Sequence, residues 1–240
     1  MEKEIKEFNK YVKNYNLKDK NIMGKYHHSF RVMEFCKEIA ISLKLNERDI
    51  YIASLCGLLH DIARFSQWTK YQTYVDKKSF DHGDEGEKIL SEIIHKFTND
   101  SEISSIVMKS TKYHNKINVP SLDERYLLFI KIVRDADKLD IMIEQGNYIS
   151  TDKIELKKEL LESIYNKQVC KNEYMTNEVD VIIRIISWIF DLNYKYSYHY
   201  LINKKIIEKK FNLLEMYGET EYTIKLKKFI EENINQKLGE

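Results

Sequence analysis

Apolar residues recur every three or four positions along most of the chain, which is the spacing that puts them on one face of an α-helix. Before residue 146 this pattern predicts helices over about 2–15, 26–43, 46–61, 83–97, 100–114 and 121–143. Farther along it predicts helices near 152–168, 178–200, 203–216 and 219–236. Residues 66–79 are aromatic and polar without a clear period, so we expect a long excursion there with about one helical turn.

The supply of turn residues favours the same fold class. Seven Gly and one Pro are too few for a β-rich fold, whereas an all-α protein needs only a few breaks. The segment that begins at Gly146 interrupts the helical pattern, and 240 residues suit one domain with an extension or two small domains. We therefore predict an all-α chain with a helical core over residues 1–145 and a helical extension over residues 146–240 that packs on the core.

Charge and cysteine content restrict the partners and the compartment. The 39 Lys and Arg against 38 Asp and Glu leave a net charge of +1, so no global field attracts nucleic acid or anionic membrane. The apolar stretch 181–190 contains Arg184 and is too short to span a bilayer, and the charged N-terminus has no leader pattern. Three cysteines without metal-ligand spacing are typical of reduced core residues. These features indicate a cytoplasmic protein without a membrane partner.

Five ionisable residues fall on the apolar faces of the expected helices: His28, His60, Asp61, His114 and Asp137. One histidine at a helix edge is most often an ordinary core or surface residue, and one aspartate near a helix end is usually a cap. Together they are harder to explain, because a buried carboxylate costs several kcal/mol unless it is compensated. A shared cation compensates all of them, and this ligand chemistry suits Mn, Fe, Co, Ni or Zn.

These residues and their order resemble a known family. His28 in HSFRV, His60-Asp61 in GLLHDIARF and Asp137 in RDADKLD resemble the H…HD…D signature of the HD-domain metal-dependent phosphohydrolase superfamily. The resemblance covers about residues 22–145. It implies that these four residues bind a divalent cation, one of Mn, Fe, Co, Ni, Zn or Mg, and that Asp61 can bridge to a second ion.

Two further histidines, His82 and His114, match positions that many members of the superfamily carry. The resemblance implies either that they bind a second cation or that they donate hydrogen bonds to the substrate phosphate. Nucleotidase-like members carry glutamate three residues after the aspartate, but this chain has Arg64 there. Arg64 and Lys138 are suited to contact a phosphate, although pairing with an acidic residue near a helix end is the alternative. Glu85 is a candidate for handling the proton of the attacking water.

The function that follows from the resemblance is hydrolysis of a phosphate ester in a small phosphorylated substrate, with a nucleotide or related metabolite as the favoured class. Asp61 would orient the water, and His82 or His114 would protonate the leaving group. Two alternatives stay open: a regulatory module that senses a nucleotide with little turnover, and a nucleic-acid-processing phosphodiesterase, which the net charge disfavours. The sequence also leaves open whether the C-terminal helices cover the pocket, form the interface of a homodimer or complete the core.

Overall fold

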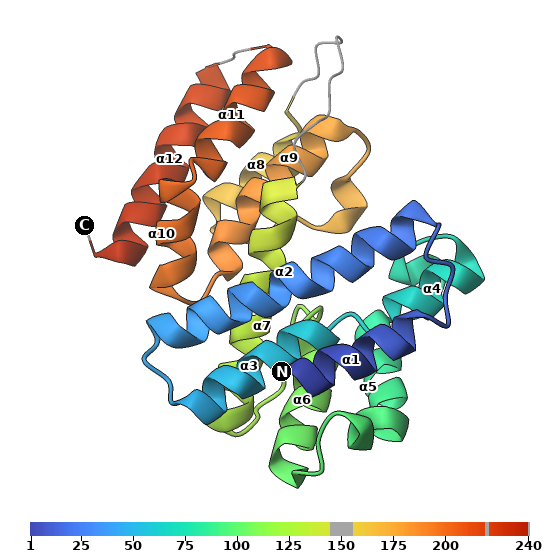
Figure 1. The fold of residues 1–240 in the computed structure, drawn as a ribbon. Coiled ribbons are helices and arrows are strands. Elements are labelled where there is room, and N and C mark those ends of the chain that lie inside the picture. Colours follow the sequence, from blue (N-terminus) through green and yellow to red (C-terminus); the bar gives the residue numbers. More distant parts are fainter. Residues whose placement is uncertain (145–155, 219–220, 240) are drawn as a thin grey trace. The chain divides into compact units, whose positions relative to one another are not determined.

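The computed structural model describes residues 1–144, 156–218 and 221–239, and every regular element in these ranges is helical. This confirms the all-α fold. The chain divides into two compact units, Met1–Asp140 and Ile141–Glu240 (Figure 1). The predicted domain boundary between residues 145 and 146 lies outside the described residues. No described helix is both long enough and apolar enough to cross a membrane.

The helices of the first unit are the six predicted ones, in order, with one more between the third and the fourth. They are α1 (Glu2–Val12), α2 (Lys20–Ser42), α3 (Glu47–Leu59), α4 (Arg64–Tyr71), α5 (His82–Ile93), α6 (Ser101–Tyr113) and α7 (Glu124–Glu144), with short 3-10 turns at Asp76–Lys78 and Ile94–Lys96. α7 extends past Asp140. Side-chain oxygens accept hydrogen bonds from free backbone N–H groups in the first turns of these helices, as N-caps do. The capping residues are Asp19, Asn46, Asp81, Asp100 and Asp123.

Three local predictions were wrong. Residues 64–71, most of which we expected in an irregular excursion, form α4, which ends where Gln72 takes a left-handed conformation with φ of 52°. α2 begins at Lys20 and not near residue 26, because Asp19 caps it. The helix that we expected from residue 121 begins at Glu124, where the Asp123 side chain accepts from Arg125 N at 2.8 Å.

α2 and α3 pack closely where Gly57 faces α2. A Cβ atom on Gly57 would lie 2.8 Å from Cys36 Sγ and 2.9 Å from Met33 Cα, so only glycine permits this separation. Cys36 and Cys56 are fully buried here and are free thiols. The contact fixes the end of α3 against the middle of α2, and three residues after Gly57 the chain reaches His60.

α5 and α6 are held in the same way by Gly83. A Cβ atom on Gly83 would lie 2.5 Å from the Lys112 carbonyl oxygen and 2.5 Å from Asn115 Oδ1. The first turn of α5 therefore lies directly against the last turn of α6. This places His82, the first residue of α5, beside His114, the residue that follows α6.

The second unit has its own buried core. Its helices are α8 (Lys158–Tyr165), α9 (Glu178–Ser187), α10 (Lys195–Asn203), α11 (Ile206–Met216) and α12 (Glu221–Leu238), with 3-10 turns at Asn172–Tyr174 and Trp188–Asp191. The single helix that we predicted over 178–200 is two helices, because the 3-10 turn and the extended Leu192 interrupt it. The buried Tyr198 hydroxyl stabilises the break by donating to the carbonyl oxygens of Ile189 and Leu192, at 2.8 and 3.1 Å.

Candidate metal centre

The first unit brings together all six histidines and aspartates that the sequence singles out as candidate ligands. They come from the middle of α2, the segment after α3, the start of α5, the end of α6 and α7: His28, His60, Asp61, His82, His114 and Asp137. Five of these residues are buried, and the side chain of Asp137 is 21% exposed. The centre is thus enclosed by protein with Asp137 near its open side.

Four of these side chains form one compact set, which we call the first group: His28, His60, Asp61 and Asp137. His28 Nε2 lies 3.2 Å from His60 Nε2, 3.4 Å from Asp61 Oδ2 and 3.2 Å from Asp137 Oδ1. His60 Nε2 lies 3.5 and 3.6 Å from the same two carboxylate oxygens. Ligand atoms about 2.1 Å from an ion are roughly 3.0 Å apart in an octahedron and roughly 3.4 Å apart in a tetrahedron. The spacing of the first group therefore suits one divalent cation.

A second group forms around the other oxygen of Asp61. His82 Nε2 and His114 Nε2 are 3.1 Å apart and lie 3.6 and 3.5 Å from Asp61 Oδ1. Asp61 Oδ1 is buried and accepts no hydrogen bond in the structure. A buried carboxylate oxygen without a donor is costly, and a cation between it and the two imidazoles would satisfy it. Asp61 can thus bridge two cations, one on each oxygen.

The other ring nitrogen of every histidine in the two groups contacts an oxygen that can only accept a hydrogen bond. The pairs are His28 with Asp140 Oδ2 at 2.7 Å, His60 with Gly57 O at 2.7 Å, His82 with Asp76 Oδ2 at 2.6 Å and His114 with Thr111 O at 2.7 Å. Each Nδ1 therefore carries a proton, and in the neutral ring the lone pair on Nε2 points to the centre. This is the tautomer that binds a metal.

The pKa shifts distinguish the two groups. Burial lowers the pKa of His28, but hydrogen bonds from its ring to Asp137, Asp140 and Asp61 outweigh burial and raise it to about 10. Burial dominates at His114 and lowers its pKa to about 4, and it also lowers the pKa of His82. The first group is thus anionic enough to take up a proton in place of a cation, whereas the imidazoles of the second group stay neutral.

Both carboxylates of the first group are held in the ionised form. Burial alone would raise the pKa of Asp61. The charges of Lys25 and His60 outweigh burial and hold this pKa well below its ordinary value. Burial also raises the pKa of Asp137, and hydrogen bonds from His28 and His60 more than reverse this effect. Two carboxylates that stay charged in a buried centre provide the negative charge that a divalent cation requires.

Some residues of the centre were missed in the sequence. Lys25 Nζ donates to Asp61 Oδ2 at 2.7 Å, and Arg31 donates from Nε and Nη2 to Asp140 at 2.6 and 3.1 Å. Lys25 and Arg31 are three residues before and after His28, and Asp140 is three residues after Asp137. Residues three apart share a helix face, so this spacing was a usable signal.

The structure places Arg64, Lys138 and Glu85 in other contacts. Arg64 Nη1 donates to Gln67 Oε1, the Tyr74 carbonyl oxygen and Asp76 Oδ1, at 2.6, 2.7 and 3.1 Å. Lys138 Nζ donates to the Arg134 carbonyl oxygen at 3.3 Å, and Glu85 pairs with Lys88 at 3.3 Å. Arg64 Nε lies 3.5 Å from Asp61 Oδ1, so Arg64 borders the second group. The roles predicted for these three residues stay predictions.

The aromatic residues of the 66–80 segment pack on one another. The rings of Trp68 and Tyr74 are 5.1 Å apart and those of Tyr71 and Phe80 are 5.7 Å apart. Lys25 Nζ and the Arg64 guanidinium lie 5.6 and 5.5 Å from the centre of the Tyr74 ring. Tyr74 therefore forms an aromatic wall beside the two cations that border Asp61.

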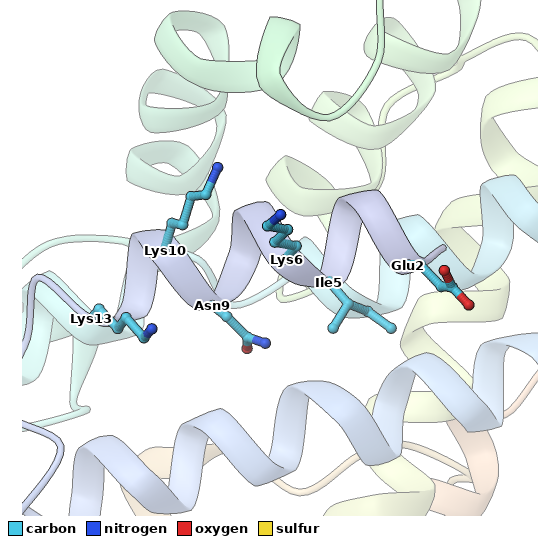
Figure 2. Close-up of a pocket in the computed structure, with 6 residues that line it drawn as sticks. All are labelled: Glu2, Ile5, Lys6, Asn9, Lys10 and Lys13. Atoms are coloured by element: carbon cyan, nitrogen blue, oxygen red, sulfur yellow. The ribbon is translucent and has the colours of Figure 1, made fainter.

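A separate groove of about 300 Å³ follows α1 and is lined by Glu2, Ile5, Lys6, Asn9, Lys10 and Lys13. Figure 2 shows Lys6 and Lys10 on one side of the helix and Ile5, Asn9 and Lys13 on the other. It contains no histidine, and Lys10 is paired with Glu7 at 2.6 Å. This groove offers no counterpart to the ligand set of the metal centre.

Comparison with known proteins gives one family and one solved structure. The HD domain model matches residues 26–142, a range that includes all six candidate ligands. A crystal structure described as a predicted HD superfamily hydrolase from an uncultured Thermotogales bacterium is similar at 20% identity with a TM-score of 0.41. The match covers 85% of this chain and 91% of that chain. No curated protein matches the chain.

Proposed function

We propose that this chain, which belongs to the HD domain family through residues 26–142, hydrolyses a phosphate ester in a small phosphorylated substrate. Family membership supports a metal-dependent hydrolase in general. The observation that carries the finer proposal is the first group, in which His28 Nε2 lies within 3.4 Å of the three other ligand atoms. A divalent cation bound there would lower the pKa of water to about 7 and withdraw charge from the phosphate oxygens.

The residues of the first group have separate tasks in this proposal. With a cation bound in place of the proton, His28 and His60 would each present the lone pair of Nε2, and Asp140 holds the His28 ring in orientation through the 2.7 Å contact with Nδ1. Asp61 stays ionised and would orient the attacking water beside the first cation. Asp137, at the open side, completes the ligand set.

Lys25 is the cation that we propose for the substrate phosphate. Its ammonium lies 2.7 Å from Asp61 Oδ2, and its side chain is 18% exposed. A lysine in this position can neutralise a phosphate oxygen that approaches Asp61. The ring of Tyr74 beside Lys25 offers an apolar surface next to the charge. This pairing supports a nucleotide or a related phosphorylated metabolite as the substrate class.

For His82 and His114, the contacts support cation binding over proton donation. Burial lowers the pKa of both, to about 4 for His114, so both are neutral at pH 7. Their Nδ1 protons are engaged by Asp76 and the Thr111 carbonyl, which leaves acceptor nitrogens beside Asp61. We therefore propose that a second cation can bind the second group. We also keep the expectation that the substrate is a small molecule and not nucleic acid, because the net charge is +1.

Phosphate or alcohol release tests this proposal. The purified chain is incubated with Mn²⁺ and with phosphomonoesters, cyclic nucleotides, and nucleoside di- and triphosphates. We expect hydrolysis of one class, its loss on chelation, and its loss in Asp61→Ala. Glu92→Gln is the matched control, because Glu92 is an exposed carboxylate on α5, away from the ligand set.

Each pattern of results is decisive. Hydrolysis that persists unchanged in Asp61→Ala would contradict the assigned role of Asp61. If the protein binds Mn²⁺ but hydrolyses none of these substrates, the result would favour a sensing module. Salt-sensitive hydrolysis of single-stranded RNA or DNA would favour the nucleic-acid-processing alternative.

A further inference from the structure

The four histidines of the centre are oriented by partners of different kinds. His60 and His114 each donate to a carbonyl three residues earlier, in the last turn of their own helix, at 2.7 Å. His28 is oriented by Asp140, which is 1% exposed. His82 is oriented by Asp76, which lies in the connection between α4 and α5 with 29% of its side chain exposed. One ligand of the second group therefore depends on a surface segment.

α4 holds Asp76 in place. Asp76 Oδ1 accepts from Arg64 Nη1 at 3.1 Å and from Gln67 Nε2 at 3.0 Å, while its Oδ2 accepts from His82 Nδ1 at 2.6 Å. Gln67 is fully buried, and its Nε2 also lies 2.8 Å from Ser79 Oγ and 3.1 Å from the Phe80 carbonyl oxygen. The segment is thus fastened on both sides of Asp76.

The same segment also borders the first group. The Tyr74 hydroxyl donates to the Asn21 carbonyl oxygen at 2.9 Å, and the Tyr74 ring lies under Lys25. Lys25 in turn contacts Asp61 Oδ2 at 2.7 Å, the oxygen that belongs to the first group. The Trp68 ring lies 5.1 Å from the Tyr74 ring at an angle of 36°, so its indole is adjacent to the segment. A change in residues 72–81 therefore alters the surroundings of both oxygens of Asp61.

The Asp76 contact decides which nitrogen of His82 carries the proton. Asn115, the other side chain near Nδ1, has its amide nitrogen there at 3.3 Å, and an amide nitrogen donates but does not accept. Without the carboxylate, the proton of the neutral ring would move to Nε2, the nitrogen that faces Asp61 Oδ1 and His114. The second group would then lose a ligand while the first group kept all of its ligands.

We infer that Asp76 is a positioning residue that makes His82 a ligand for a second divalent cation, and that binding of this ion is coupled to the conformation of residues 72–81. The inference rests on the proposed function, since both cations share Asp61. The coupling is reciprocal. An ion that requires His82 in this tautomer stabilises the segment that carries Asp76. Displacement of the segment in turn lowers the affinity for the ion. Cation occupancy and the aromatic wall at Tyr74 would change together.

Titration calorimetry with Zn²⁺ on the chelator-treated full chain provides the first test. We expect two ions per wild-type chain. Asp76→Asn should lower the affinity for one ion by about 10–100-fold and leave the affinity for the other unchanged. This is the usual loss of metal affinity when a partner that orients a ligand is removed. Asp140→Asn, the matched change on His28, should weaken the other ion by a similar factor. Glu92→Gln should bind as wild type does.

Trp68 fluorescence provides a second test that does not depend on the stability of the Asp76 variant. The chain has two tryptophans, so Trp188→Phe leaves Trp68 as the single reporter. We expect its emission to change as the second ion binds. In the Asp76→Asn background that change should shift to about 10–100-fold higher Zn²⁺.

Three results would overturn the inference. The wild-type chain could bind a single ion, the affinities for both ions could be unchanged in Asp76→Asn, or Trp68 emission could stay constant as the second ion binds. None of these touches the proposed hydrolysis, which needs only the first group. Conversely, absence of hydrolysis by a chain that binds two ions would refute the proposed function and leave the role of Asp76 intact. The two failures are therefore distinguishable.

Discussion

Lys210 is buried on the apolar face of α11, and its replacement should stabilise the second unit. The residue is 3% exposed and lies between Ile206, Ile207, Phe211 and Leu214 on the same buried face. Burial lowers its pKa from 10.5 to about 8, and no carboxylate of the described residues offsets this effect. At pH 7 the folded chain therefore carries a buried ammonium.

The pKa shift gives the size of the effect and its pH dependence. A pKa lowered from 10.5 to about 8 corresponds to about 3 kcal/mol of destabilisation. The full cost is present below pH 8, where both states are protonated. It declines as pH rises from 8 to 10.5, because there the unfolded state binds the proton and the folded state does not. Lys210→Met should thus be more stable than wild type by about 3 kcal/mol at pH 7 and by much less at pH 10.5.

Urea denaturation at pH 7, 9 and 10.5 measures this difference. Far-UV circular dichroism follows helix content, and Lys209→Met is the control, because Lys209 is the exposed neighbour on the same helix. The control should change stability little at every pH. A gain for Lys210→Met that is equal at pH 7 and pH 10.5 would refute the reasoning, since it would come from packing and not from the buried charge.

Three further predictions concern the metal centre. Gly57→Ala should destabilise the protein by about 1–3 kcal/mol in urea denaturation and weaken Mn²⁺ binding in calorimetry. The added Cβ would push α3 away from α2 and so separate His60 from His28. An unchanged Mn²⁺ affinity would contradict this prediction. Asp140→Asn should lower hydrolysis with Mn²⁺ and shift its half-saturating Mn²⁺ concentration upward by about 10–100-fold, and an unshifted concentration would show that Asp140 does not orient His28. Metal-free wild type should lose stability relative to His114→Gln as pH falls from about 6.5 to about 4. In this range the unfolded state binds a proton at His114 and the folded state does not, because burial lowers the pKa of His114. Thermal melting temperatures of the two proteins that change in parallel across this range would contradict the prediction.

Much of the fold was readable from the sequence because helices leave periodic patterns and polar caps. Asn46 and Asp100 stand at the start of two predicted helices, and their side-chain oxygens cap α3 and α6. The break after Trp188 was not readable, because the apolar period continues across it. That break is stabilised by Tyr198, a residue farther along the chain, and periodicity contains no such tertiary information.

The candidate ligands were readable for a different reason. Asp137 and His60 stand out because an ionisable side chain on an apolar face needs compensation, and the compensating groups had to be nearby. Asp76 gave no such signal, because it lies in a stretch without a helical period. Its role depends on the 2.6 Å contact with His82, which arises only when α4 and the start of α5 hold the intervening segment in place.

Anomalous diffraction from crystals of the full chain soaked in Mn²⁺ tests the central claim most directly. The account predicts a strong Mn²⁺ peak about 2.1 Å from His28 Nε2, His60 Nε2, Asp61 Oδ2 and Asp137 Oδ1. It further predicts that the peak is lost in Asp61→Ala and kept in Glu92→Gln. A centre without a Mn²⁺ peak, with His28 and Asp137 still in their direct 3.2 Å contact, would contradict the account.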